Sequence, residues 1–151
     1  MNTKQLHPLP AVRTLIENAD GKILILRRAN TDFGQGDWCL PGGKVDYGQT
    51  IEEALSREIM EELSQKLVFA EFFFYQDSLP LVPGEPHFIN FYFHCQVTGE
   101  MRLNEESSEF AWIGPADTPR YTIVFRNDEA IHRHFNSQSN RAAISRMENH
   151  V

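Results

Sequence analysis

Apolar and polar residues alternate along the first part of the chain in a way that predicts two β-strands. Residues 11–17 and 22–28 are apolar runs, and the segment 18–21 between them, Asn-Ala-Asp-Gly, is typical of a turn. This arrangement predicts a β-hairpin. Alternation in the second run places Arg27 on one face of the strand and Arg28 on the other.

The next segment combines a long loop with the clearest helix of the chain. Residues 29–48 are rich in glycine, asparagine and aspartate, which predicts a loop with a functional role. Residues 50–65 have helical periodicity, and Thr50 and Glu53 have the spacing of a capping box.

The second half of the chain predicts a mixed α/β fold. Periodicity and breakers indicate strands over 68–76, 87–97 and 109–113 and a final helix over 128–135. Strands on both sides of one central helix, followed by a terminal helix, favour a mixed β-sheet sandwiched between helices, of the α/β (α+β mixed) class.

The length predicts one domain. A chain of 151 residues and 17.4 kDa can bury a core without disulfide or zinc support. The polar, poorly patterned composition of residues 136–151 sets the expected domain boundary at 135, so that 1–135 form the domain and 136–151 a tail, helical or poorly ordered.

Charge and composition narrow the classes of partner. Fourteen basic and twenty-one acidic residues give a net charge of −7, the opposite of what binding to a nucleic-acid polymer requires. A small anionic substrate would need a local basic cluster or a divalent cation to screen it. Without a signal-peptide pattern or a long apolar run, the expected location is cytoplasmic, with no membrane partner, and Cys39 and Cys95 are expected to be buried, reduced thiols.

The central helix concentrates carboxylates beside its apolar face. On a helical wheel Glu58 and Glu62 fall at the margin of the apolar stripe and Glu61 lies further round. A solvated acidic face is the simpler interpretation, but like charges four residues apart repel and Arg57 cannot neutralise three acids. Mg²⁺ or Mn²⁺, which prefers oxygen ligands, would do so. The Gly42–Gly43 pair before the helix can approach this edge closely and offer carbonyls to a metal or amides to an anion.

These residues resemble the signature of the Nudix hydrolases, Gly-x5-Glu-x7-Arg-Glu-U-x-Glu-Glu-x-Gly-U, where U is a bulky aliphatic residue. Gly43 opens it, Arg57-Glu58-Ile59 and Glu61-Glu62 match at the required offsets, and residues 38–43 resemble the usual lead-in. The likeness extends over about residues 10–135. Three positions depart from the pattern: Gln49, Ser64 and Gln65 replace the glutamate, the glycine and the final aliphatic residue.

The resemblance implies a Nudix-like fold and metal-dependent hydrolysis of a nucleoside diphosphate derivative, such as a nucleoside triphosphate or an NDP-sugar, by attack of water on phosphorus. It implies Glu58, Glu61 and Glu62 as ligands of Mg²⁺ or Mn²⁺, with the Gly42 carbonyl as a further ligand. Glu58 or Glu62 would also serve as the base that activates the attacking water, and Arg57 would orient a glutamate.

The departures from the signature have physical consequences of their own. Gln49 would replace a salt bridge to Arg57 with a hydrogen bond between a neutral and a charged group. Ser64 makes a left-handed helix end costlier than glycine would, so the helix could instead continue through Leu67.

Further candidates lie outside the signature. Arg27 or Arg28 would bind a phosphate, unless the pair only ends a strand in solvent. Glu105, Glu106 and Glu109 precede Trp112 much as a further acid often precedes a tryptophan in this family. Glu109 is the favoured base or additional ligand of the three, unless it is an ordinary surface acid. Phe33 and Trp38 could stack on a base, although Trp38 is more typical of packing. Gly43 would contribute backbone contacts to the substrate.

Two other functional classes compete with the enzyme. One is a catalytically weak Nudix-like domain that binds or senses a nucleotide, which Gln49 would favour. The other is a structural protein with an acidic surface helix. Substrate choice is expected to lie in loops 29–37 and 79–86, and the apolar strand content leaves room for a homodimer.

Overall fold

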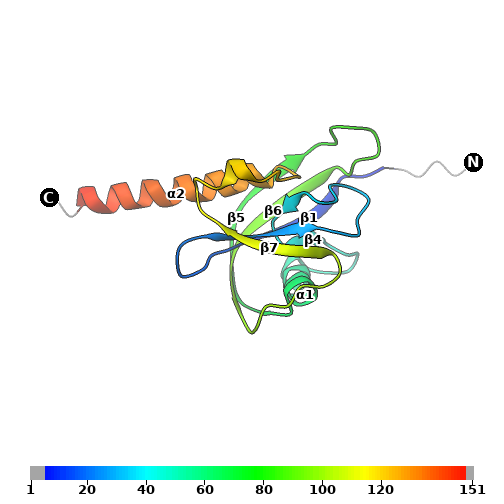
Figure 1. Ribbon diagram of the computed structural model, residues 1–151, viewed down its shortest axis with the longest axis horizontal. Coiled ribbons are helices and arrows are strands. Elements are labelled where there is room, and N and C mark those ends of the chain that lie inside the picture. The colour runs from blue at the N-terminus through cyan, green and yellow to red at the C-terminus, as the bar shows by residue number, and fades with distance from the viewer. Residues whose placement is uncertain (1–5, 149–151) are drawn as a thin grey trace, which may run out of the picture.

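The computed structural model describes residues 6–148 and consists of two β-sheets and two long helices (Figure 1). The strands, in chain order, are β1 (Leu9–Ile16), β2 (Ile23–Arg28), β3 (Trp38–Cys39), β4 (Gly42–Lys44), β5 (Lys66–Ser78), β6 (Phe88–Thr98) and β7 (Ser107–Ile113). The helices are α1 (Ile51–Leu63), a short 3-10 turn η1 (Thr118–Arg120) and α2 (Asn127–Glu148). One sheet has the order β4-β1-β6-β5 and the other β3-β2-β7.

The predicted hairpin between the first two strands is wrong, although the turn between them forms. The Asn18 side chain accepts hydrogen bonds from the backbone N–H groups of Asp20 and Lys22. Beyond a single bridge between Glu17 and Ile23, however, β1 pairs with β6 in parallel and with β4, whereas β2 pairs with β3 and β7. The two strands separate into different sheets because each finds its partners elsewhere in the chain.

Two hydrophobic clusters lie on opposite sides of the strands, which confirms the prediction of mixed sheet structure between helices. One cluster joins α1 to β1 and β2 through residues such as Leu55, Ile59 and Leu26. The other joins α2 to the opposite faces of the same strands through Ile131 and Ile25. In Figure 1, α1 and α2 accordingly lie on opposite sides of the strands.

Capping interactions at both ends determine where helix α1 begins and ends. The Thr50 side chain accepts from the Glu53 backbone N–H at 3.1 Å and the Glu53 carboxylate accepts from that of Thr50, which confirms the capping box. Ser64 ends the helix in the left-handed conformation with φ of 57°, so the alternative in which the helix continues through Leu67 is wrong. Its hydroxyl donates to the Arg102 carbonyl at 3.2 Å, which offsets part of the cost of a non-glycine residue here.

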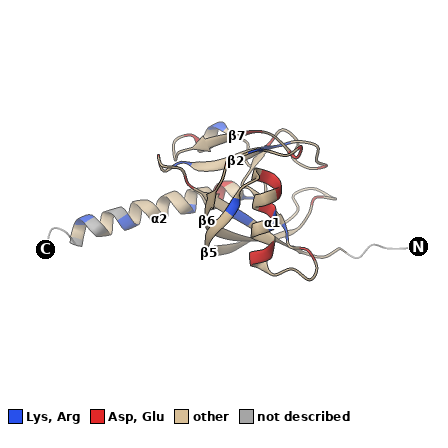
Figure 2. Ribbon diagram, turned by 90° about the horizontal axis from the view of Figure 1, so that it is seen from below, with Lys and Arg blue, Asp and Glu red and all other residues tan. Residues whose placement is uncertain are grey.

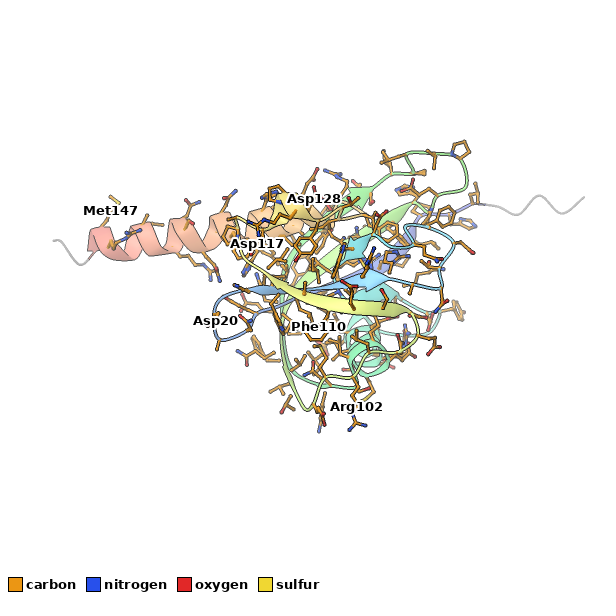
Figure 3. The ribbon with its side chains drawn as sticks, viewed as in Figure 1. Asp20, Arg102, Phe110, Asp117, Asp128 and Met147 are labelled. Carbon is orange, nitrogen blue, oxygen red and sulfur yellow. The ribbon has the colours of Figure 1, made fainter. Side chains whose placement is uncertain are left out.

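Helix α2 is longer than the sequence pattern predicts. It runs through the expected boundary at 135, so the described part of the tail, residues 136–148, is helical, and residues 149–151 lie outside the described range. Figure 3 places Met147 at the far end of this helix, where it projects beyond the strands. Within residues 6–148, no helix has both the length and the apolar character needed to span a membrane.

Candidate active site

A cavity of about 550 Å³ opens where α1, β4 and the loop after β2 meet. Figure 2 shows acidic residues along α1, the helix that forms part of the cavity wall. The structure brings most of the predicted site residues together on its wall: Arg28, Phe33, Gly42, Gly43, Arg57, Glu58, Glu61 and Glu62. Residues from three separate parts of the sequence therefore meet in one pocket.

Glu58 and Glu62 form a buried carboxylate pair one helical turn apart. Their exposed fractions are only 8% and 9%, and the Gly42 backbone N–H donates to Glu62 Oε2 at 3.0 Å. The Glu58 carboxylate lies so close to Gly43 that a Cβ at position 43 would be 2.6 Å from its Cδ atom. A Cβ at position 42 would in turn overlap the backbone of Val12, with its carbonyl carbon at 2.9 Å. Both glycines are required because the backbone passes too close to its neighbours for a side chain.

The electrostatics of this pair favour a cation. Burial raises the pKa of Glu62 well above its ordinary value, and the neighbouring Glu58 charge raises it further. Burial also raises the pKa of Glu58, against the charge of Arg57, and the two carboxyl groups are close enough to share a proton. Two adjacent carboxylates with little solvent gain a large advantage from a positively charged ligand.

Arg57 holds the acidic cluster in place. Its Nη1 donates to Glu58 at 2.9 Å and to Glu61 at 3.3 Å, and its Nη2 donates to the Lys44 carbonyl at 2.9 Å. The same Nη2 donates to Gln49 Oε1 at 3.1 Å, which confirms the expected neutral-to-charged hydrogen bond at this departure from the signature. Asp46, whose Oδ2 is 3.3 Å from Nη2, supplies a carboxylate partner that Gln49 does not.

The structure does not bring Arg27, Glu109 or Trp38 to this pocket. Arg27 and Glu109 face each other across the β2–β7 pair, with Nη1 of the arginine 3.3 Å from the carboxylate, and both side chains are exposed. They lie on the face opposite Arg28 because neighbouring residues of a strand point to opposite sides. Trp38 packs edge-on against Tyr121, with ring centroids 5.0 Å apart.

Arg28 lies in the pocket, but its donors are occupied by protein groups. Its Nε donates to the Phe33 carbonyl at 3.1 Å, its Nη2 to Thr31 Oγ1 at 3.0 Å and its Nη1 to Cys39 Sγ at 3.7 Å. These bonds fix the loop after β2 around the pocket. Cys39 and Cys95 are both buried and free, as expected.

Several pocket residues are absent from the sequence-based prediction: Arg13, Lys44, Asp46, Phe88 and Phe125. Arg13 is the most informative of them, because it is 3% exposed and lies in a strand whose neighbours are apolar. A single cation inside an apolar run is a signal that could have identified it, since charged residues are rarely fully buried without a partner.

The acidic residues offer carboxylate oxygens as metal ligands, although these oxygens do not yet surround a single metal position. Within residues 6–148, no group of three or more histidine, cysteine or acidic side chains is already gathered around one point. Glu61 is turned toward Arg57 with its side chain half exposed, whereas Glu58 and Glu62 lie side by side. The pair is the part of the cluster that is ready for a hard divalent cation, and Glu61 could join it by leaving Arg57.

Comparisons with known proteins agree with this geometry. The profile of the NUDIX domain matches residues 7–134. A nucleoside triphosphatase NudI from Escherichia fergusonii is 36% identical over 120 residues, which cover 72% of this chain and 84% of that protein.

Solved structures give the same picture. The MutT protein of Methanosarcina mazei superposes with a TM-score of 0.73 at 26% identity, over 93% of this chain and 99% of that one. A MutT NUDIX hydrolase from Burkholderia pseudomallei gives a TM-score of 0.64 at 30% identity, over 71% of this chain and 83% of that one. The likeness therefore covers both the sheets and the helix that carries the acidic cluster.

Proposed function

This chain belongs to the Nudix hydrolase family, as a pyrophosphohydrolase, and we propose that it cleaves a phosphoanhydride bond of a nucleoside triphosphate or related nucleoside diphosphate derivative in a divalent-metal-dependent reaction. The observation that carries this proposal is the buried Glu58–Glu62 pair, set against Gly42 and Gly43 on the wall of a cavity. The nucleoside triphosphatase relative supports the choice of substrate class.

The donor set fits Mg²⁺ or Mn²⁺. Glu58 and Glu62 offer carboxylate oxygens whose burial disfavours their charged forms. Of these two acids, Arg57 bonds directly to Glu58 and not to Glu62. Glu58, Glu61 and Glu62 would hold the ion, with the Gly42 carbonyl as a further ligand. When bound, the cation screens the charge of the phosphates and lowers the pKa of a coordinated water.

The chain's own residues then have distinct roles. Glu58 or Glu62 would accept a proton from the attacking water, because both carboxylates lie on the cavity wall beside which that water would be held. Arg57 is a positioning residue. Its hydrogen bonds to Glu58 and to the Lys44 carbonyl hold helix α1 in place against β4. Phe33 lies at the pocket wall, where a base could stack, and the Gly43 backbone borders the carboxylates.

Glu109 has no place in this mechanism. Its carboxylate pairs with Arg27 on the far side of the β2–β7 pair, so neither residue can contact a substrate held in the cavity without a rearrangement. The acid that β7 and its preceding loop bring to the pocket is Glu106.

The test is a hydrolysis assay on a panel of nucleoside triphosphates, NDP-sugars, ADP-ribose and dinucleoside polyphosphates, with Mg²⁺, Mn²⁺ or EDTA. Glu62→Gln should lower the metal-dependent rate about a hundredfold or more, because a neutral amide is a poor ligand and a poor base. Glu52→Gln, which removes an exposed carboxylate from the first turn of the same helix, is the matched control and should retain activity.

The alternative function, a nucleotide-binding domain without significant hydrolysis, would be favoured by a different result. In that case the unaltered protein and Glu62→Gln would be equally inactive on the whole panel, while nucleotide still bound to both.

Other features of the protein stay predictions. A small nucleotide derivative, and not a nucleic-acid polymer, is the expected partner because the chain carries a net charge of −7. A cytoplasmic location and a homodimer also remain predictions. For the homodimer, the surface best suited to pairing is the outer edge of β5, where Val68, Phe69, Phe72 and Tyr75 are at least half exposed.

A further inference from the structure

Arg13 is a buried cation whose terminal nitrogens, Nη1 and Nη2, open onto the cavity. Its Nε donates to Asn90 Oδ1 at 3.3 Å, and its guanidinium carbon lies 5.3 Å from the Phe88 ring centroid and 5.2 Å from that of Phe125. Within residues 6–148, its Nη1 and Nη2 donate to no protein group, although the side chain is only 3% exposed and lines the cavity with Glu58 and Glu62.

The other cationic side chains of the cavity differ from Arg13 because their terminal nitrogens are either bonded to protein groups or exposed to solvent. Every donor nitrogen of Arg28 is used to bind the loop after β2 and Cys39, and the Nη atoms of Arg57 are used for the acidic cluster and the Lys44 carbonyl. Lys44 is exposed at the mouth of the cavity. Arg13 thus combines a buried side chain with terminal N–H groups that face the cavity.

A polar network holds the Arg13 guanidinium in a defined orientation. Asn90, which is fully buried, accepts from Arg13 and donates to the Phe125 carbonyl at 3.1 Å. Asn127 donates to the same carbonyl at 3.1 Å and to Tyr92 Oη at 3.2 Å. Phe125 itself adopts a positive φ of 59°, a conformation that the two asparagines stabilise. The network therefore fixes the Phe125 backbone, and the Phe125 ring packs edge-on against the Phe88 ring with centroids 5.1 Å apart.

The Nη atoms of Arg13 are not fully enclosed by protein and open onto the cavity, where an anionic ligand would form charge-assisted hydrogen bonds with them. A phosphate offers a full negative charge and the planar pair of oxygens that a guanidinium binds best, whereas the carbonyl of a base offers only a neutral acceptor. Arg13 also lies close enough to Glu62 for its charge to act on that carboxyl group. A phosphate on Arg13 would therefore lie beside the acidic pair.

We propose that Arg13 binds a phosphate group of the substrate at the inner end of the cavity, next to the scissile bond, and that Asn90 is its positioning residue. This proposal rests on the proposed function and makes it more specific. A nucleoside triphosphate can place an additional phosphate against Arg13, whereas the sugar of an NDP-sugar would leave neutral hydroxyl groups there. Arg13 accordingly selects for polyphosphate chains.

The test measures binding separately from hydrolysis. The probes are imidodiphosphate, a pyrophosphate analogue that resists hydrolysis, and the four common nucleosides, titrated calorimetrically with Mg²⁺ present. Arg13→Gln should weaken imidodiphosphate binding at least tenfold, since a hydrogen bond between charged groups is lost, and should leave nucleoside binding unchanged. Arg102→Gln removes an exposed arginine of the β6–β7 loop, which Figure 3 places at the lower edge of the molecule and which does not line the cavity, and should change neither.

Three results would overturn the proposal. Unchanged imidodiphosphate binding in Arg13→Gln would show that Arg13 has only a structural role. Loss of nucleoside binding alone in this variant would show that Arg13 contacts the base. Absence of imidodiphosphate binding to the unaltered protein would show that no phosphate site exists. If Arg13→Gln does not fold, Arg13→Lys provides the test, because lysine keeps the positive charge but lacks the planar guanidinium group that binds two phosphate oxygens. Arg13→Lys should then lower kcat/KM several-fold more for nucleoside triphosphates than for NDP-sugars, and an equal decrease would contradict the selection.

The binding experiment also separates this proposal from the proposed function. If the unaltered protein hydrolyses nothing in the panel yet binds imidodiphosphate through Arg13, the phosphate site stands and the enzymatic proposal fails. If hydrolysis depends on Glu62 but imidodiphosphate binding is insensitive to Arg13, the enzymatic proposal stands and the phosphate site fails.

Discussion

Replacing Gly43 with alanine should disable the acidic pair while leaving the fold intact. The added Cβ would lie 2.6 Å from Glu58 Cδ and 2.8 Å from Oε2, with Oε1 closer still. Ordinary contact begins near 3.4 Å, so the carboxyl group must move by about 0.8 Å from its Cδ distance alone. Because Glu58 is buried between Arg57 and Glu62, this movement means leaving a favourable rotamer, at a cost of about 0.5–1.5 kcal/mol.

The effect on catalysis should be far larger than the effect on stability. A displacement of about 1 Å in a catalytic group typically costs about a hundredfold in rate. Gly43→Ala is therefore expected to lower metal-dependent kcat about a hundredfold and to weaken Mn²⁺ binding, with a small decrease in the free energy of unfolding. The measurements are steady-state hydrolysis with Mg²⁺, calorimetric titration with Mn²⁺ and urea denaturation.

Gly114→Ala is the matched control for this substitution. Gly114 has no positive φ, lies outside the cavity, and an added Cβ would meet Asp117 Oδ2 at an ordinary 3.5 Å. If Gly43→Ala were as active as Gly114→Ala, Glu58 would not need its observed position, and the argument from the close approach of Gly43 would be refuted.

Two further outcomes follow from the acidic cluster. Because the pKa values of Glu58 and Glu62 are raised above 4.5, the folded protein retains protons that the unfolded chain releases. In EDTA, the free energy of unfolding should therefore decrease as pH rises above about 4.5 through the raised pKa values, and Glu62→Gln should flatten this decrease. Burial lowers the pKa values of His94 and His134, which adds an opposite slope to both proteins, so an identical pH profile for Glu62→Gln and the unaltered protein would contradict the assignment. Gln49→Glu, which keeps the acceptor for Arg57 and adds a charge, should tighten Mn²⁺ binding or leave it unchanged in a calorimetric titration, and weaker binding would show that Gln49 does not act through Arg57.

Local patterns in the sequence were sufficient to predict the helix that carries the acids. The capping box at Thr50 and Glu53 defines where it begins, and a spacing of four residues places Glu58 and Glu62 on one side whatever surrounds them. The alternation of β2 likewise separates Arg27 from Arg28 before any partner strand is known. These features depend on backbone geometry over a few residues, and so they are readable from one chain.

Tertiary structure alone decided which strands pair and which residues complete the pocket. The turn at 18–21 is a good local turn, yet β1 pairs with β6, almost eighty residues away, because pairing depends on contacts that periodicity does not encode. Glu109 has the spacing of a candidate base, but its register opposite Arg27 turns it away from the cavity. Arg13 becomes part of the site only when Asn90 and Phe125, distant in sequence, enclose it, and such an enclosure exists only in the folded chain.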